Sequence, residues 1–169
     1  MGSEMCIRDR VRTGIGYDVH RLSVGETLII GGVTIPSDKG SVGHSDGDVL
    51  THAVVDALLG AAALGDIGTH FPSSNDRWKG ASSLTFLSHV VELVNEAGFV
   101  IANVDGTVIL ESPRLSEHLH SMRQTLSSEM GLDTQNFSVK ATTTDGLGFT
   151  GSGEGVGAVA IATLRRPDS

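Results

Sequence analysis

The chain has 169 residues, a net charge of −8 and 39% hydrophobic residues, which suits a single domain with a buried core. The acidic charge argues against a nucleic-acid partner, because phosphate backbones bind basic surfaces, and no apolar run is long enough to predict a membrane span. Cys6 is the only cysteine, so we expect no disulfide framework, no thiolate metal site and a reducing, cytoplasmic setting.

The two ends of the chain differ from the rest. Residues 1–10 mix acidic and basic side chains without periodicity and lack the apolar stretch of a secretory signal. We interpret them as a disordered tag or another non-native leader. Residues 11–165 are predicted to form one domain, and residues 166–169 a tail that frays.

The first half of the domain predicts strands followed by helices. Residues 13–20 are typical of a strand, and residues 28–35 of a hairpin that turns at Gly31-Gly32, a favourable two-residue turn. Apolar residues then recur at helical spacing over residues 47–64 and 82–97, which predicts two helices.

The second half predicts a strand over residues 100–110 and a helix that begins near Pro113 and carries an apolar stripe as far as Met130. Residues 137–141 and 155–164 are predicted as the closing strands. The expected fold is α+β: a mainly antiparallel four-stranded sheet with helices on one face, plus a small hairpin. The last strand is apolar on both faces, so we expect another subunit to cover the face that the helices leave open.

Three candidate metal ligands lie on neighbouring predicted elements. Asp18 and His20 are separated by one residue, so on a strand both side chains point to the same face. His52 lies in the first turns of the following helix and could complete the set. One carboxylate and two imidazoles suit zinc with one open position. The spacing alone is also compatible with a histidine buried in an apolar core.

Further polar residues surround His52 in the sequence. Asp56 is four residues later, shares the helical face and is predicted to orient the imidazole. Before the helix, His44 and Ser45 lie near a helix N-terminus, where backbone N–H groups favour an anion. We therefore predict phosphate binding beside the metal. Asp46 or Asp48 is expected to cap the helix.

Residues 140–155 form a second loop suited to phosphate. Threonines 142–144 offer hydroxyl and N–H groups, and Asp145 offers a carboxylate for a hard cation such as Mg²⁺. The glycines allow the backbone to approach a ligand closely. The loop does not match a Walker A motif, because Lys140 precedes the glycines. A strand edge followed by a flexible turn is the alternative.

Taken together, the motifs resemble the family of 2-C-methyl-D-erythritol 2,4-cyclodiphosphate synthases, enzymes of the non-mevalonate route to isoprenoids. The resemblance extends over almost the whole of residues 13–164. It is carried by GIGYDVHRL (14–22), IIGGVTIP (29–36), GHSDGDVLTHAVVDALLGAAALGDIGTHFP (43–72), NVDGTVI (103–109) and KATTTDGLGFTGSGEG (140–155).

The resemblance implies a homotrimer whose sheets surround a threefold axis and whose active sites lie between subunits. It implies that 4-diphosphocytidyl-2-C-methyl-D-erythritol 2-phosphate is converted to 2-C-methyl-D-erythritol 2,4-cyclodiphosphate and CMP, a phosphorus–oxygen lyase reaction. In that reaction the 2-phosphate attacks the β-phosphorus. The resemblance also implies one zinc per active site, Mg²⁺ or Mn²⁺ as a second cofactor, and association with neighbouring enzymes of the pathway.

Site residues follow by position. The resemblance implies Asp18, His20 and His52 as zinc ligands and Asp145 as the magnesium ligand. It implies His44 and Thr143 as catalytic residues that stabilise the transition state. Substrate contacts are implied for Asp18, Val19, His20, His44, Ser45, Asp66, Ile67, Gly68, Phe71, Pro72, Ser73, Ser74, Asn75, Leu110, Glu111, Ser112, Pro113, Arg114, Leu115, Ser116, Ala141, Thr142, Thr143, Thr144, Asp145 and Phe149.

Three positions depart from the family pattern. Asp145 stands where the family often carries a glutamate, and Arg114 stands where it carries a lysine. Ser152 replaces an arginine that helps to hold a diphosphate in the central cavity of the trimer. None of these changes touches the three predicted zinc ligands.

Two other functions compete with the cyclising lyase. One is a zinc hydrolase that attacks a phosphate ester with metal-bound water; Asp56 is the only obvious general base beside the ligands. The other is a catalytically silent trimer that binds a nucleotide or an isoprenoid diphosphate. Release of free phosphate would favour the first, and CMP binding without turnover would favour the second.

Overall fold

A computed structural model describes residues 11–167. The predicted leader, residues 1–10, and the last two residues of the predicted tail lie outside the described residues. Within the tail, the Arg166 guanidinium lies 4.4 Å from the centroid of the Phe99 ring.

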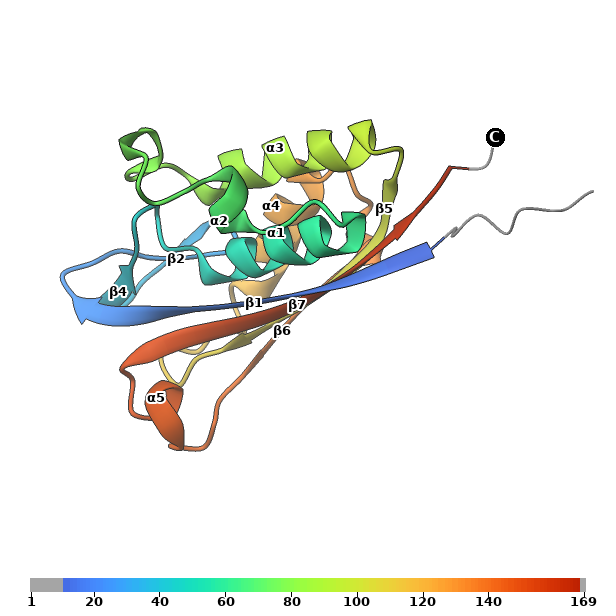
Figure 1. Cartoon of the computed structure of the whole chain (residues 1–169). Helices are drawn as coiled ribbons and strands as arrows, with labels where there is room; N and C mark the ends of the chain where they lie inside the picture. The colour runs from blue at the N-terminus through green and yellow to red at the C-terminus, as the bar shows by residue number, and fades with distance from the viewer. Residues whose placement is uncertain (1–10, 168–169) are drawn as a thin grey trace, which may run out of the picture.

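The described chain forms one large sheet, a small hairpin and a layer of helices (Figure 1). The sheet contains five strands in the order β4-β1-β7-β5-β6, and β2 pairs with β3 as the predicted hairpin. The strands are β1 (Val11–Val24), β2 (Leu28–Ile30), β3 (Val33–Ile35), β4 (Lys39–Val42), β5 (Val100–Ile109), β6 (Phe137–Thr142) and β7 (Gly155–Arg165).

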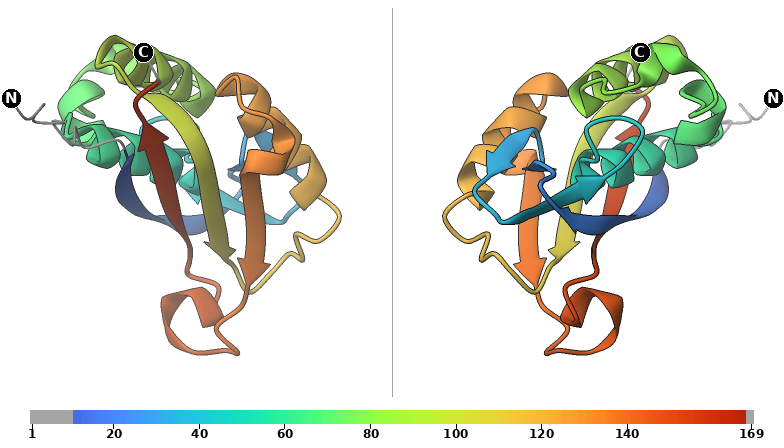
Figure 2. Two further views of the ribbon diagram at one scale, coloured as in Figure 1. Left: turned by 90° about the vertical axis from the view of Figure 1, so that its right-hand side faces the viewer. Right: turned by 90° about the vertical axis from the view of Figure 1, so that its left-hand side faces the viewer.

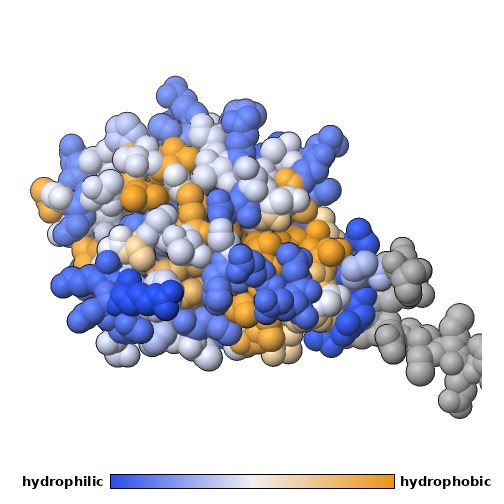
Figure 3. All heavy atoms as spheres, turned by 90° about the horizontal axis from the view of Figure 1, so that it is seen from above, coloured by the Kyte–Doolittle hydropathy of each residue, from blue (hydrophilic) through white to orange (hydrophobic). Residues whose placement is uncertain are grey.

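Helices α1 to α4 lie on one face of the sheet, whereas α5 lies beyond the strand ends, between β6 and β7 (Figures 1 and 2). Seen from the helix side, most of the surface is hydrophilic, with hydrophobic residues in a few areas (Figure 3). The helices are α1 (Val49–Ala62), α2 (Ile67–His70), α3 (Ser83–Glu96), α4 (Leu119–Glu129) and α5 (Gly148–Gly151), with 3₁₀ turns η1 (Asp76–Trp78) and η2 (Thr134–Asn136).

The sheet differs from the predicted one in strand number and direction. It has five strands rather than four, and β5 and β6 run parallel while the other pairs are antiparallel. Strand β4 is short and polar, so it lacks the alternation that marks a strand in a sequence. Strand β6 is parallel to β5 because helix α4 carries the chain back across the sheet between them.

The predicted helix at Pro113 begins later than expected. Helix α4 starts at Leu119, and the preceding residues form a loop whose first amide, that of Leu110, donates to the Thr142 carbonyl at 3.0 Å. This bond holds the start of the loop beside β6, and a turn, in which the His118 amide donates to the Leu115 carbonyl at 2.9 Å, precedes the helix. The predicted apolar stripe is nevertheless buried at Met122, Leu126 and Met130.

Helix α1 contacts β1 unusually closely. A Cβ atom on Gly16 would lie 1.8 Å from the Ala53 carbonyl oxygen, and one on Gly14 would lie 2.1 Å from the Ala57 oxygen. Only glycine permits this approach. Asp48, one of the two predicted caps, caps the helix by accepting the Thr51 amide at 3.0 Å.

The last strand, β7, is covered on one face as predicted. Val156, Ala158 and Ala160 are buried beneath the helices. On the opposite face, Ile161 of β7 pairs with Ile15 of β1, and these side chains are 44% and 69% exposed. None of the helices in residues 11–167 is long and apolar enough to span a membrane.

Candidate functional site

Asp18, His20 and His52 come together where β1 faces the first turns of α1. Asp18 and His20 are two residues apart on β1, so both side chains face the helix, as their spacing predicts. Asp18 Oδ2 lies 2.8 Å from His20 Nε2 and 3.0 Å from His52 Nδ1. The two imidazole nitrogens are 3.1 Å apart. Three donor atoms from two elements therefore converge on one point.

The outer nitrogen of each imidazole is held by a polar partner. His20 Nδ1 donates to the Val42 carbonyl on the neighbouring strand β4 at 3.0 Å. His52 Nε2 lies 2.8 Å from Ser83 Oγ and 3.1 Å from Ser45 Oγ. Such partners of the outer nitrogen are typical of metal-binding histidines, because they leave the inner lone pair free.

The donor set fits a zinc ion. Tetrahedral zinc with bonds of about 2.0–2.1 Å separates its ligand atoms by roughly 3.3 Å. The three donor atoms, all within 4.8 Å of one another, are close to that arrangement. Two imidazoles and one carboxylate also leave a fourth position for substrate. The residues present are therefore those of a metal site with one open position.

Hydrogen bonds and opposite charges hold the three side chains together in the absence of a metal ion. Burial would raise the pKa of Asp18, but the hydrogen bonds and charges of His20 and His52 outweigh it and lower this pKa to about 2. Burial would lower the pKa of His20, yet its bond to Asp18 raises it. Asp18 is thus ionised at neutral pH and serves as an anionic ligand.

A pocket of about 210 Å³ opens beside these three residues. Its lining includes His44 and Ser45 from the loop before α1, and His44 Nε2 lies 3.3 Å from the Asn75 carbonyl oxygen. It also includes Ile67, Gly68, Phe71 and Ser73. The structure therefore brings His44 and Ser45, predicted to bind phosphate, and several other predicted substrate contacts together beside the candidate zinc ligands.

Two aspartates organise the chain around α2. Asp66 Oδ1 accepts the amide and the hydroxyl of Thr69, both at 2.8 Å, and these bonds lower the Asp66 pKa. Asp56 accepts the Ile67 amide at 2.7 Å. Burial raises the pKa of Asp56, and the Ile67 amide opposes this shift. This hydrogen bond of Asp56 ties α1 to α2, and the orientation of the His52 imidazole by Asp56 stays a prediction.

Three aromatic residues line the pocket beside the candidate zinc ligands as a cluster, and only Phe71 among them was predicted to belong to the site. The Phe71 and Phe86 rings stack with centroids 4.4 Å apart, and Trp78 meets both rings edge-on. Phe86 also stacks on His52 at 6.1 Å. These residues lie on separate elements, so their spacing in the sequence carries no signal. Together they support the imidazole of His52 on its apolar side.

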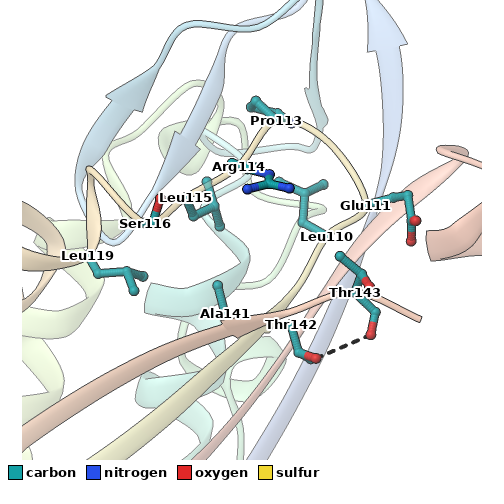
Figure 4. Close-up of a pocket in the computed structure, with 10 residues that line it drawn as sticks. All are labelled: Leu110, Glu111, Pro113, Arg114, Leu115, Ser116, Leu119, Ala141, Thr142 and Thr143. Atoms are coloured by element: carbon teal, nitrogen blue, oxygen red, sulfur yellow. Dashed lines mark hydrogen bonds between the residues drawn. The ribbon is translucent and has the colours of Figure 1, made fainter. Parts of the chain in front are cut away.

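A second pocket, of about 220 Å³, lies where β5 and β6 end. In Figure 4, Leu115, Leu119 and Ala141 lie on one side of it and Glu111 and Thr143 on the other. Its remaining lining residues are Leu110, Pro113, Arg114, Ser116 and Thr142. Nine of the predicted substrate contacts, all from residues 110–116 and 141–143, therefore surround this one pocket.

Asp145, the predicted magnesium ligand, is two residues after Thr143, which lines the second pocket. Asp145 is exposed and has a φ of 52°, and Thr143 Oγ1 donates to its carboxylate at 3.4 Å. Thr144 donates to the Leu147 carbonyl at 2.6 Å, which stabilises the turn. Phe149 lines a third hollow with Val19 and His20.

The two predicted catalytic residues lie in different pockets. His44 lines the pocket at the zinc ligands, whereas Thr143 lines the pocket at the ends of β5 and β6. These two pockets share no lining residue. In the described part of the chain, the predicted site residues therefore form two groups, one at each of these pockets.

The fold and the site define an α+β protein that combines a candidate zinc centre with a separate pocket at the ends of two parallel strands. The chain belongs to the YgbB family, whose family model matches residues 11–165.

Curated relatives are of two lengths. The 2-C-methyl-D-erythritol 2,4-cyclodiphosphate synthase of Alkaliphilus oremlandii is 53% identical over 91% of this chain and 98% of the relative. The bifunctional enzyme IspD/IspF of Novosphingobium aromaticivorans is 59% identical over 90% of this chain. The chain spans only 40% of that bifunctional relative.

Solved structures share the fold. The bifunctional IspDF from Campylobacter jejuni matches with a TM-score of 0.90 at 39% identity, over 94% of this chain and 43% of that chain. The IspF of Plasmodium falciparum, solved as a CDP complex, matches with a TM-score of 0.84 at 32% identity, over 95% of this chain and 99% of that chain.

Proposed function

We propose that this protein converts 4-diphosphocytidyl-2-C-methyl-D-erythritol 2-phosphate to 2-C-methyl-D-erythritol 2,4-cyclodiphosphate and CMP. The convergence of Asp18, His20 and His52 within 4.8 Å of one another is the observation that carries the proposal. Its support is membership of the YgbB family and 53% identity to a full-length relative named as this synthase.

The reaction is an intramolecular phosphoryl transfer. An oxygen of the 2-phosphate forms a bond to the β-phosphorus, and the bond from that phosphorus to the oxygen bridging to the α-phosphate breaks. The electron pair of the broken bond leaves with CMP. Such reactions depend mainly on positioning and on neutralising charge. When bound, zinc supplies a Lewis acid that polarises a phosphate oxygen.

The chain's own residues orient the two ends of the substrate. Ser45 and His44, half-buried beside the zinc ligands, are suited to hydrogen-bond phosphate oxygens. Asp66 binds Thr69 through Oδ1, so Oδ2 can accept from an erythritol hydroxyl. The second pocket then takes the cytidine, and Asp145 holds Mg²⁺ or Mn²⁺ against the diphosphate.

The division of the predicted site residues between two pockets supports a homotrimer with shared active sites. The two pockets share no lining residue, and in the proposed trimer a neighbouring subunit brings its second pocket to the candidate zinc ligands, so that one substrate contacts both groups of residues. The outer face of the sheet supports this assembly, because Ile15 and Tyr17 are 69% and 59% exposed there. Exposed apolar rows of this kind mark interfaces.

The bifunctional relatives support a link to a neighbouring enzyme. The relative from Novosphingobium aromaticivorans is named as a bifunctional enzyme, and this chain spans 40% of that relative's length. We infer that the chain associates with an enzyme that acts nearby in the same route, and that it works in the cytoplasm.

The deciding experiment is incubation of the purified protein with the diphosphocytidyl substrate, zinc and magnesium, while CMP and the phosphorus spectrum are followed. CMP appearing together with a cyclic diphosphate is the expected result. Free phosphate or a linear diphosphate would instead indicate hydrolysis. Tight binding of CMP without turnover would indicate a silent nucleotide-binding protein, and both outcomes contradict the proposal.

A further inference from the structure

A chain of hydrogen bonds runs behind His52, on the side away from the other two zinc ligands. It begins at Asp46 in the loop before α1, passes through Ser83 in the first turn of α3 and ends at His52 Nε2. Ser83 is fully buried, and its Oγ lies 2.8 Å from His52 Nε2. The sequence gives no hint of this contact, because 31 residues separate Ser83 from His52.

The direction of each bond follows from chemistry. A carboxylate only accepts hydrogen bonds, and Asp46 accepts both the Ser83 hydroxyl and the Ser83 amide, the latter at 2.9 Å. The single hydrogen of the hydroxyl is thereby used. Ser83 Oγ can then only accept from the imidazole, so His52 Nε2 must carry a hydrogen.

This arrangement fixes the state of the third zinc ligand. With one hydrogen fixed on Nε2, Nδ1 is the nitrogen that faces Asp18 Oδ2 at 3.0 Å: it donates to this carboxylate when the ring is protonated, and it offers its lone pair to a metal ion when the ring is neutral. We propose that Ser83, held by Asp46, is the positioning residue that sets the tautomer and the ring orientation of His52 for metal binding. This inference rests on the zinc centre of the proposed function.

Two neighbouring serines have different tasks. Ser45 Oγ also lies 3.1 Å from His52 Nε2, but Ser45 is half-buried and lines the pocket, so its hydroxyl can turn to a phosphate. Ser82 caps α3 by accepting the Leu84 amide at 3.3 Å. The helix therefore does not depend on the Ser83 hydroxyl for its cap.

The test measures metal affinity and tautomer, not turnover. For Ser83→Ala we expect zinc affinity, measured by competition with a chromogenic chelator, to fall 10- to 100-fold, the usual effect of losing a partner behind a ligating histidine. In metal-free protein at a pH where the imidazole of His52 is neutral, long-range proton–nitrogen NMR should show hydrogen on Nε2 in the wild type and a mixture of tautomers in the variant.

Two further variants separate positioning from folding. Asp46→Asn replaces one of the two carboxylate oxygens by an NH₂ group, which only donates. This group would face either the Ser83 amide, which is also a donor, or the Ser83 hydroxyl, which would then turn its hydrogen towards His52. The variant should therefore also lower zinc affinity and shift the tautomer of His52. Ser82→Ala is the matched control: it loses the cap, so its unfolding midpoint should fall while its zinc affinity stays unchanged.

The outcomes distinguish this inference from the proposed function. Equal zinc affinity and an unchanged tautomer in Ser83→Ala would overturn the positioning role even if the enzyme is active. Weak zinc binding by the wild-type protein would contradict the metal centre itself. A tautomer that still depends on Ser83 in that case would support the hydrogen-bond chain.

Discussion

At the scale of single residues, Asp18 holds the site together. Its Oδ2 is shared by His20 and His52 at 2.8 and 3.0 Å. Without metal, the ionised carboxylate is what keeps two imidazoles facing one point. A bound zinc ion would replace these hydrogen bonds, and the three donor atoms already lie within 4.8 Å of one another.

The shifted pKa of Asp18 predicts a pH-dependent contribution to the stability of the metal-free protein. Because the folded pKa of about 2 lies below the ordinary value of 3.8, the contribution is present above pH 3.8 and is lost as pH falls through 2. We expect Asp18→Asn to be less stable than the wild type by about 2 kcal/mol at pH 5. Urea unfolding should show this difference disappear near pH 2; a constant difference would contradict the assignment.

A substitution at Asp145 tests the proposed roles of Mg²⁺ and zinc independently of each other. Asn tolerates a positive φ as well as Asp does, so Asp145→Asn should keep the turn that has a φ of 52° at this position. We expect turnover and its dependence on Mg²⁺ to fall at least about 10-fold, the usual loss when a metal's charge-neutralising role is removed, with zinc content unchanged. Elemental analysis and CMP release measure both. Equal loss of zinc would indicate that this loop is structural.

At the scale of elements, the distance between α1 and β1 controls the geometry of the zinc ligands. Asp18 and His20 are on the strand and His52 is on the helix. Gly16 is two residues before Asp18, and it faces the Ala53 carbonyl next to His52. Any side chain at Gly16 must push the helix, and His52 with it, away from the strand.

Gly16→Ala should therefore reduce both stability and metal binding. The added Cβ would lie 1.8 Å from the Ala53 oxygen, so we expect a loss of about 3 kcal/mol or more and weaker zinc binding. Gly60→Ala is the matched control on the same helix, because its Cβ meets nothing closer than 3.9 Å. It should gain up to about 1 kcal/mol of stability. If both variants bind zinc equally, the spacing does not control the site.

The elements also show which parts of the fold and of the candidate site could be predicted from the sequence alone. The spacing of Asp18 and His20 and the apolar patterns of α1 and α3 are local features, so the shared face of these two side chains and both helices were predictable from the sequence. Strand β4 and the parallel β5–β6 pair depend on partners distant in the chain. The same holds for Ser83 and the aromatic rings behind His52, which reach the site only through tertiary packing.

At the scale of the whole molecule, the proposed trimer would make the two pockets halves of one site that different subunits complete. His20 belongs to the first pocket and Thr143 to the second. A substrate with a cytidine at one end and a phosphorylated polyol at the other needs both halves. In a closed ring of three subunits, each interface would join the first pocket of one subunit to the second pocket of its neighbour.

Subunit mixing tests this arrangement directly. His20→Ala and Thr143→Ala should each be inactive as pure proteins. When the two are unfolded together and reassembled, about a quarter of the interfaces should combine an intact first pocket with an intact Thr143, as random assembly of two subunit types predicts. CMP release should return to a corresponding fraction of the wild-type rate. Adding Ile15→Asp, which places a charge on a side chain that is 69% exposed on the outer face, should abolish the recovery if that face forms the interface. No recovery without Ile15→Asp would mean that each subunit builds its site alone, because only a shared site can combine the intact halves of two defective chains.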